Sequence, residues 1–165
     1  MSNSNKKPTK ALIGVAGVHF VVSELSLRGL VALPTIRNTA GIDILVSELD
    51  GSGQANLQVK TRSSEEDYWP TSGPKRCLKG RRSFYVFVQY LPDEERFEAF
   101  LESGSNVAKQ VQDNLQDDQK GGRKYFPYWG LPSYFGLPSA AEETEKLREK
   151  WRDWRPPPIQ HSHIG

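Results

Sequence analysis

The sequence predicts an α/β fold in which a mixed central sheet is flanked by helices. A long apolar stretch without proline comes first, clusters of β-branched and aromatic residues broken by turn signals follow, and capped helical segments come last. With 165 residues, 36% of them hydrophobic and 25% charged, the chain is the size of one domain. We expect a flexible basic arm over residues 1–10, a single domain over 11–155 and a disordered proline- and histidine-rich tail over 156–165.

The first helix is expected over residues 9–28. This segment is long enough for five turns, and it ends at Arg28 before Gly29, a common signal for a helix end. Apolar residues lie nearly all round it, with Glu24 as a polar exception, so the helix should be mostly buried. His19 is then expected to be a packed core histidine.

Three strands are expected next, over residues 30–33, 41–48 and 56–61. The turn Asp50-Gly51-Ser52-Gly53 should join the last two in a hairpin. A long basic loop over 62–82 follows, then a strand rich in valine and aromatic residues over 83–91. Residues 95–103 are a candidate for one further strand.

Two helices are expected in the second half of the chain. Ser105 should cap a helix over 106–115, and Ser139 with Glu142 forms a capping box for a helix from 139 to 154. Trp151 and Trp154 should anchor this last helix in the core. Residues 120–138, rich in glycine, proline and aromatic residues, should form an irregular covering loop.

The composition argues against several classes of protein. Cys77 is the single cysteine, which excludes an intrachain disulfide and a cysteine-rich zinc site. There is no run of eighteen apolar residues and no signal-peptide pattern at the start, so we expect a cytoplasmic protein without a membrane anchor.

Asp43 and the segment Gln58-Val59-Lys60 form the candidate site. Side chains alternate along a strand, so Gln58 and Lys60 should share one face, and the hairpin should bring Asp43 close to them. The Asp43 carboxylate, the Gln58 amide oxygen, the Val59 backbone carbonyl and water could hold Mg²⁺ or Mn²⁺. The metal would polarise a phosphoryl oxygen while Lys60 orients the attacking water or stabilises charge. This arrangement suits the hydrolysis of phosphodiester bonds.

Gly41-Ile42-Asp43, a fourteen-residue gap and Gln58-Val59-Lys60 resemble the signature of the PD-(D/E)xK nuclease superfamily. The glutamine variant is similar to that of Mrr-like restriction endonucleases, and the resemblance covers residues 11–61. It implies a restriction-endonuclease-like αβββαβ core, to which this chain adds a C-terminal helix. It also implies a metal-dependent endonuclease in which Asp43, Gln58 and Glu24 hold the metal and Lys60 is catalytic. Gln58 supplies no charge where Asp or Glu is commoner, so metal affinity should be weaker unless Glu24 contributes.

Nucleic acid, first of all DNA, is the expected partner. The net charge of +2 does not establish this, but basic residues gather beside the candidate site. The expected contacts to nucleic acid are Arg37, Asn38, Arg62, Lys75, Arg76, Lys79, Arg81 and Arg82. A chain this small would have to form a homodimer or borrow a partner to cut both strands of a duplex.

Each of these assignments has a structural alternative. Asp43 and Lys60 could form a cross-strand ion pair, and Glu24 could pair with Arg28 one helical turn away. The basic loop could be merely solvated, and Arg37 with Asn38 could only shape a turn. The aromatic cluster within 125–135 fits a plug over a hydrophobic edge, or a dimer contact, better than a surface for stacking unpaired bases. For the whole protein, the alternative is a weak or inactive nuclease-fold module that binds nucleic acid or a protein partner.

Overall fold

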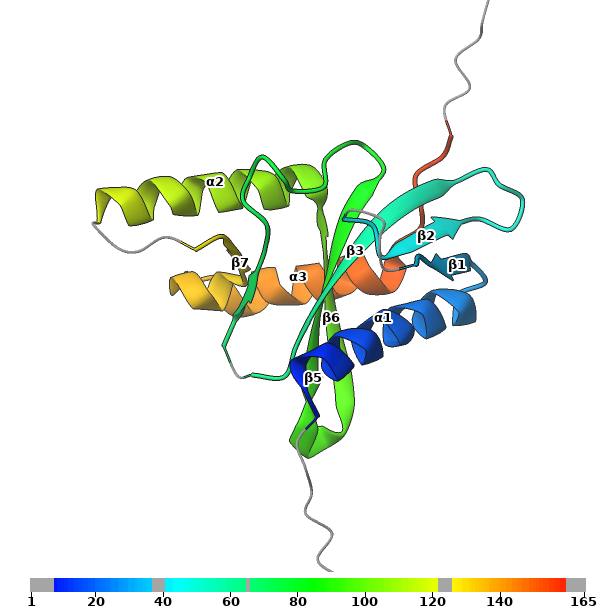
Figure 1. Cartoon of the computed structure of the whole chain (residues 1–165), viewed down its shortest axis with the longest axis horizontal. Coiled ribbons are helices and arrows are strands. Elements are labelled where there is room, and N and C mark those ends of the chain that lie inside the picture. Colours follow the sequence, from blue (N-terminus) through cyan, green and yellow to red (C-terminus); the bar gives the residue numbers. More distant parts are fainter. Residues whose placement is uncertain (1–7, 37–40, 65, 122–125, 160–165) are drawn as a thin grey trace, which may run out of the picture.

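Five strands form one mixed sheet in the order β1-β2-β3-β5-β6, and helices lie on both of its faces (Figure 1). The computed structural model describes residues 8–36, 41–64, 66–121 and 126–159. The helices are α1 (Lys10–Leu27), α2 (Gly104–Lys120) and α3 (Ala140–Asp153), with two short 3-10 helices, η1 (Pro92–Glu94) and η2 (Pro132–Phe135). The strands are β1 (Val31–Pro34), β2 (Ile44–Ser47), β3 (Gln54–Arg62), β4 (Tyr68–Pro70), β5 (Ser83–Leu91), β6 (Arg96–Ser103) and β7 (Tyr128–Gly130).

The predicted α/β architecture with a mixed sheet between helices is confirmed, including the C-terminal helix. Strand β2 pairs antiparallel with both β1 and β3, β3 pairs with β5 in parallel, and β5 pairs with β6 antiparallel. Strands β4 and β7 form a separate two-stranded sheet.

Helix α1 begins and ends where the sequence predicts. The Thr9 side chain accepts a hydrogen bond from the Leu12 amide, and Gly29 after the helix has a φ of 77°, which favours glycine. The expectation that α1 is mostly buried is wrong, because only the stripe of Ile13, Gly17, Val21 and Leu25 is buried against the sheet. By length and composition alone α1 could cross a membrane, although it packs here on β1 and β3.

The crossover from β3 to β5 differs from the order that the resemblance implies. In an αβββαβ core a helix occupies this place, but here the described part of residues 63–82 contains only the short strand β4 and irregular backbone. Pro70, Pro74 and the two glycines at 73 and 80 explain the absence of a helix, because these residues interrupt helical hydrogen bonding. The last part of this crossover, residues 71–82, is called the basic loop below.

The two later helices begin at caps that differ from the expected ones. Ser103, and not Ser105, caps α2, since its hydroxyl accepts a hydrogen bond from the Asn106 amide at 3.2 Å. The Ser139–Glu142 capping box does not form, because the Ser139 hydroxyl bonds to Glu143 instead. Both helices therefore have the predicted place, and α2 is longer than expected at both ends.

The sheet separates two hydrophobic clusters. One lies under α1 and is built around buried residues of β2, β3 and β5 such as Ile44, Leu57 and Val86. The other lies under α2 and contains Tyr85 and Phe87. Helix α3 lies against β6 and contributes to both clusters, and its expected anchors at 151 and 154 are buried.

The chain after α3 folds back onto the turn of the β2–β3 hairpin. The Gln54 amide donates to the Pro157 carbonyl at 3.2 Å, and the Ile159 amide donates to the Ser52 carbonyl at 2.7 Å. The expectation of a disordered tail from residue 156 is therefore wrong for 156–159, because exposed backbone groups of the hairpin bind this segment. Residues 160–165, with both tail histidines, lie outside the described residues.

Candidate active site

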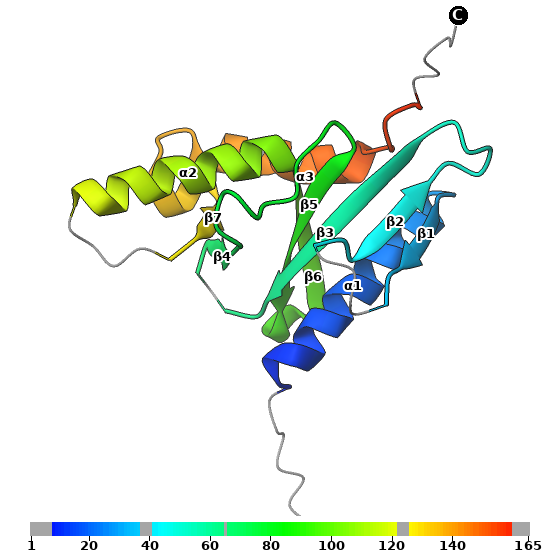
Figure 2. The ribbon, with the colours of Figure 1, turned by 45° about the horizontal axis from the view of Figure 1, so that its top comes forward.

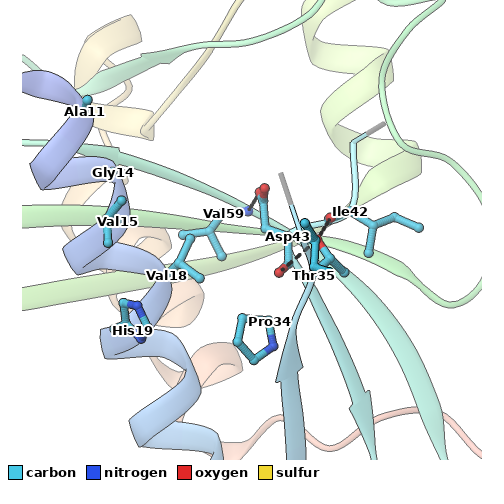
Figure 3. A pocket seen from close by; sticks show the side chains of 11 residues that line it. Ala11, Gly14, Val15, Val18, His19, Pro34, Thr35, Ile42, Asp43 and Val59 are labelled. Atoms are coloured by element: carbon cyan, nitrogen blue, oxygen red, sulfur yellow. Dashed lines mark hydrogen bonds between the residues drawn. The ribbon is translucent and has the colours of Figure 1, made fainter. Parts of the chain in front are cut away.

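The β2–β3 hairpin holds Asp43 beside the middle of β3. Ile44 is the register partner of Leu57, and the Asp43 amide donates to the Leu57 carbonyl at 2.8 Å. On the other side of Gln58, the Val59 amide donates to Oδ2 of Asp43 at 2.7 Å (Figure 3). Two hydrogen bonds that bracket Gln58 thus fix the Asp43 carboxylate against β3, as the hairpin prediction required.

Gln58 and Lys60 lie on the face of β3 that points away from α1. A Cβ atom added at Gly17 of α1 would overlap the Thr61 side chain, so Thr61 faces α1 and its strand neighbour Lys60 faces the opposite way. In the parallel register Gln58 lies next to Tyr85 of β5. Gln58 is 9% exposed and Lys60 is half-buried, so the amide is held while the lysine still meets solvent.

Tyr85 ties the basic loop to this face. Its hydroxyl accepts a hydrogen bond from the Leu78 amide at 2.8 Å, and the neighbouring Cys77 thiol donates to the Ser72 carbonyl at 3.5 Å. Burial raises the pKa of Tyr85 well above its usual range, and the Asp43 charge adds to that rise. Burial also raises the pKa of Cys77, against the opposing charges of Lys79 and Lys60. Asp43, Lys60, Tyr85 and Cys77 therefore share one electrostatic neighbourhood.

Glu24 pairs with Arg28 rather than with the candidate metal ligands. The Arg28 guanidinium donates to the Glu24 carboxylate at 3.1 Å and to the Trp151 carbonyl at 2.5 Å, and it lies 4.4 Å from the centre of the Trp151 ring. The helical ion pair considered as the alternative is thus what the structure contains. The ion pair forms here because the C-terminal end of α1 faces α3, where Trp151 holds the Arg28 guanidinium beside Glu24.

His19 and Asp43 line the same cavity. His19 is exposed, so the expectation of a packed core histidine is wrong. A cavity of about 370 Å³ opens between α1 and the strand ends, and His19, Thr35, Asp43 and Val59 help to line it (Figure 3). No sequence signal marked this position, because His19 stands in an apolar helix whose exposed side could not be identified.

Arg62 belongs to the interior and not to the nucleic-acid contacts expected of it. Its side chain is 7% exposed, its guanidinium lies 3.9 Å from the centre of the Trp69 ring, and it donates to the Tyr68 carbonyl at 2.9 Å and to Gln89 at 3.1 Å. Burial lowers the pKa of Arg62 to about 10, although Asp67 opposes that shift. Its contacts with β4 and β5 show a structural role in closing the crossover.

The remaining basic candidates lie on the surface, where the structure describes them. Lys75, Arg76, Lys79 and Arg81 are exposed and Arg82 is partly exposed. Arg37 and Asn38 lie outside the described residues. The ion pair between Asp43 and Lys60, considered as the structural alternative, is not among the ion pairs of the described residues.

The aromatic segment mainly covers the edge of the hydrophobic cluster under α2, in agreement with the plug that the sequence favoured over a surface for stacking bases. Trp129 stacks on Phe87 with ring centres 3.9 Å apart and also contacts Trp69. Phe126, Tyr134 and Phe135 remain more than one third exposed around Tyr128. Tyr125 lies outside the described residues.

The comparisons with known proteins show a likeness in structure but none in sequence. No protein-family model matches the chain, and no curated protein matches it in sequence. Among solved structures it is similar to a bacterial homing endonuclease, I-Ssp6803I, with 14% sequence identity and a TM-score of 0.47 over 84% of this chain and 98% of that one. At this identity and TM-score the likeness assigns neither an activity nor a site residue to this chain.

Proposed function

We propose that the protein is a divalent-metal-dependent, nuclease-like domain that hydrolyses phosphodiester bonds, with DNA as its substrate. One observation carries the proposal. The hydrogen bond from the Val59 amide to the Asp43 carboxylate, 2.7 Å long, holds a negative charge against the strand that presents Gln58 and Lys60. A carboxylate and an amide oxygen can hold a metal ion, and a neighbouring ammonium group can stabilise the charge that develops on a phosphate during hydrolysis.

The donor atoms fit a hard cation that keeps several water ligands. Val59 uses Oδ2 of Asp43, and the other carboxylate oxygen has no hydrogen-bond donor among the described residues. The N–H and C=O of one strand residue point to the same side, so the Val59 carbonyl also points towards Asp43. Asp43, Val59 and the Gln58 amide oxygen would hold Mg²⁺ or Mn²⁺. When bound, the metal would polarise a phosphoryl oxygen and lower the pKa of a bound water.

The protein groups supply binding and charge stabilisation around that centre. Lys60 is half-buried on β3 and still meets solvent, so its ammonium group is accessible to a phosphate or to the attacking water. Gln58 is in register with Tyr85 of β5, and Asp43 bonds to the backbone of Leu57 and Val59 on either side of it. The exposed cations of the basic loop would attract the nucleic-acid backbone before chemistry begins.

The second candidate function is a nuclease-fold module that binds nucleic acid or a protein partner with little or no catalysis. It is favoured by the shortage of negative charge: the described residues contain no group of three His, Cys, Asp or Glu side chains that could hold a metal, and Glu24 is paired with Arg28. Calorimetric titration with Mg²⁺ and Mn²⁺ separates the two functions. The nuclease predicts metal-binding heat that Asp43→Asn removes, and the binding module predicts none.

Cleavage of plasmid DNA tests the proposal directly. Asp43→Asn keeps an oxygen that accepts the Val59 amide but removes the charge, and Lys60→Met keeps the apolar stem without the ammonium group. Both should lower Mg²⁺-dependent cleavage about a hundredfold or more, because each removes charge stabilisation at the reacting phosphate. Asp93→Asn, an exposed carboxylate on η1, is the matched control and should cleave normally.

Unchanged cleavage by both Asp43→Asn and Lys60→Met, with melting temperatures equal to that of the control, would contradict the proposal. A cytoplasmic location belongs to the same proposal.

A further inference from the structure

A groove of about 350 Å³ lies between the basic loop and the first half of α2. Lys75 and Lys79 line it from the loop, and Ser105, Lys109 and Gln112 line it from the helix. All five side chains can donate hydrogen bonds, three of them carry positive charge, and no carboxylate lines the groove. Its lining chemistry therefore suits an anion.

The three lysines of the groove are not neutralised by neighbouring acids. None of them takes part in an ion pair within the described residues. Asp113, one turn after Lys109, makes no ion pair with it. Glu102 beside the start of α2 faces Lys150 at 3.7 Å and accepts a hydrogen bond from the Ser103 amide. The positive charge of the groove is thus available to a ligand.

The walls of the groove are fixed in place. The Leu78 amide donates a hydrogen bond to the Tyr85 hydroxyl at 2.8 Å, and the Leu78 carbonyl packs so closely on α2 that a Cβ at Gly104 would overlap it, so the loop is fixed at the backbone of Leu78. The Arg76 amide also bonds to the Gly73 carbonyl at 2.8 Å within the loop. Lys109 projects from a regular helix. A ligand would therefore order little backbone on binding, which favours affinity.

Cys77 links the charge of the groove to that of Lys60. Figure 2 shows the segment that leads into β5 passing the N-terminal end of α2 before it reaches the sheet. Cys77, in the middle of this loop, is 6% exposed and lies within the electrostatic reach of both Lys79 and Lys60. Positive charge thus extends from the face of β3 across the loop to α2.

We propose that this groove binds a phosphate of a nucleic-acid backbone and so guides a strand from α2 towards Lys60. The ligand chemistry is a phosphodiester oxyanion, which lysine ammonium groups bind as point charges and which the Ser105 hydroxyl can also contact. The inference rests on the proposed function and adds Lys109 and Ser105 of α2 to the surface that meets the substrate.

Binding of a short fluorescein-labelled DNA duplex, measured by anisotropy in EDTA, tests the groove without catalysis. Lys109→Glu and the double variant Lys75→Glu/Lys79→Glu should bind several-fold more weakly than the wild type. Each lost phosphate contact should reduce the steepness of log affinity against log salt concentration by about 0.9. Between about 50 and 200 mM salt, the affinity of such a variant should then fall by a factor roughly three times smaller than that of the wild type. Lys120→Glu at the other end of α2 is the control and should match the wild type.

Duplex affinity and salt slope unchanged in Lys109→Glu, or a wild type that binds no duplex at low salt, would overturn the groove. Equal loss in Lys120→Glu would overturn it too, because a general charge effect would then explain the result. Inorganic phosphate is the second probe: if it displaces the duplex at a concentration far below that of the added salt, the groove belongs to free phosphate instead. If the groove variants weaken DNA binding but the wild type cleaves no DNA, the groove is supported and the nuclease activity is contradicted. If the wild type cleaves DNA and the groove variants cleave it equally well, the nuclease activity is supported and the groove is contradicted.

Discussion

At the scale of single residues, Gly17 sets how closely α1 approaches the sheet. Replacing Gly17 with Ala should lower the free energy of unfolding by about 2 kcal/mol, because the new methyl group would overlap Thr61, whose Cγ2 would lie 2.7 Å away. Urea unfolding followed by circular dichroism measures this loss. Thr61 lies on β3, the strand that carries Gln58 and Lys60. The substitution would therefore move α1 away from the strand that carries the candidate site.

Gly14, one turn earlier in α1, provides the control. A Cβ there has no neighbour within 4 Å, so Gly14→Ala should raise stability by up to about 1 kcal/mol through helix propensity. Equal effects of the two substitutions would show that helix propensity, and not contact with Thr61, dominates at both positions.

The residues of the site were predictable to different extents. Strand alternation and the turn at 50–53 predicted that Asp43 lies against Gln58-Val59-Lys60, and the Val59–Asp43 hydrogen bond confirms that placement. The interior position of Arg62 was not predictable, since the Trp69 ring that covers it comes from a crossover without periodicity. The spacing of Glu24 and Arg28 indicated that they could pair. That Arg28 also binds the Trp151 carbonyl of α3 was not predictable, because α3 is distant in the sequence.

At the scale of elements, a charged cluster holds α3 against β6. Glu98 accepts hydrogen bonds from Arg148 at 2.9 Å and is paired with Arg96 at 2.8 Å. Burial alone would raise the pKa of Glu98, but the two arginines outweigh it and hold the pKa below the ordinary value of 4.5. A lowered pKa in the folded state means that this stabilisation is complete above about pH 4.5 and is lost as the pH falls through the folded-state pKa.

Glu98→Gln should therefore cost about 0.5–1 kcal/mol at pH 7, a modest value because Arg96 and Arg148 are partly solvated. The variant should also lose less stability than the wild type between pH 5 and 3. Urea unfolding at a series of pH values measures both effects. Parallel stability curves for the two proteins over that range would contradict the assignment.

Elements with a local signal were predicted well, and elements defined by tertiary contacts were not. The cap and the terminal glycine of α1, the glycine-containing turn of the hairpin and the valine-rich run of β5 all lie within a few residues of what they determine. By contrast, β4 and β7 are three residues each and form only because they pair with one another.

At the scale of the whole molecule, residues 156–159 bind the turn of the β2–β3 hairpin, at whose start Asp43 lies. Truncation after Arg155 removes the hydrogen bonds that Gln54 and Ser52 make with the tail, and stability should fall by about 1–3 kcal/mol. Truncation after Ile159 keeps both bonds and is the control. Thermal melting of the two shortened proteins measures the difference, and equal melting temperatures would show that the tail contributes nothing to stability.

The sheet contains the β5–β6 hairpin, whose strands are close in the sequence, and the parallel β3–β5 pair, whose strands are far apart. Strands β5 and β6 are connected by η1, whereas the parallel pair β3 and β5 is separated by a long crossover whose described residues form no helix. Closing so long an irregular loop costs entropy before any contact compensates for it, and parallel pairing forms slowly for that reason. We expect the β5–β6 hairpin to form early during folding and the β3–β5 pairing to form late. The groove beside α2 and the face with Lys60 would then come together only in the last step of folding.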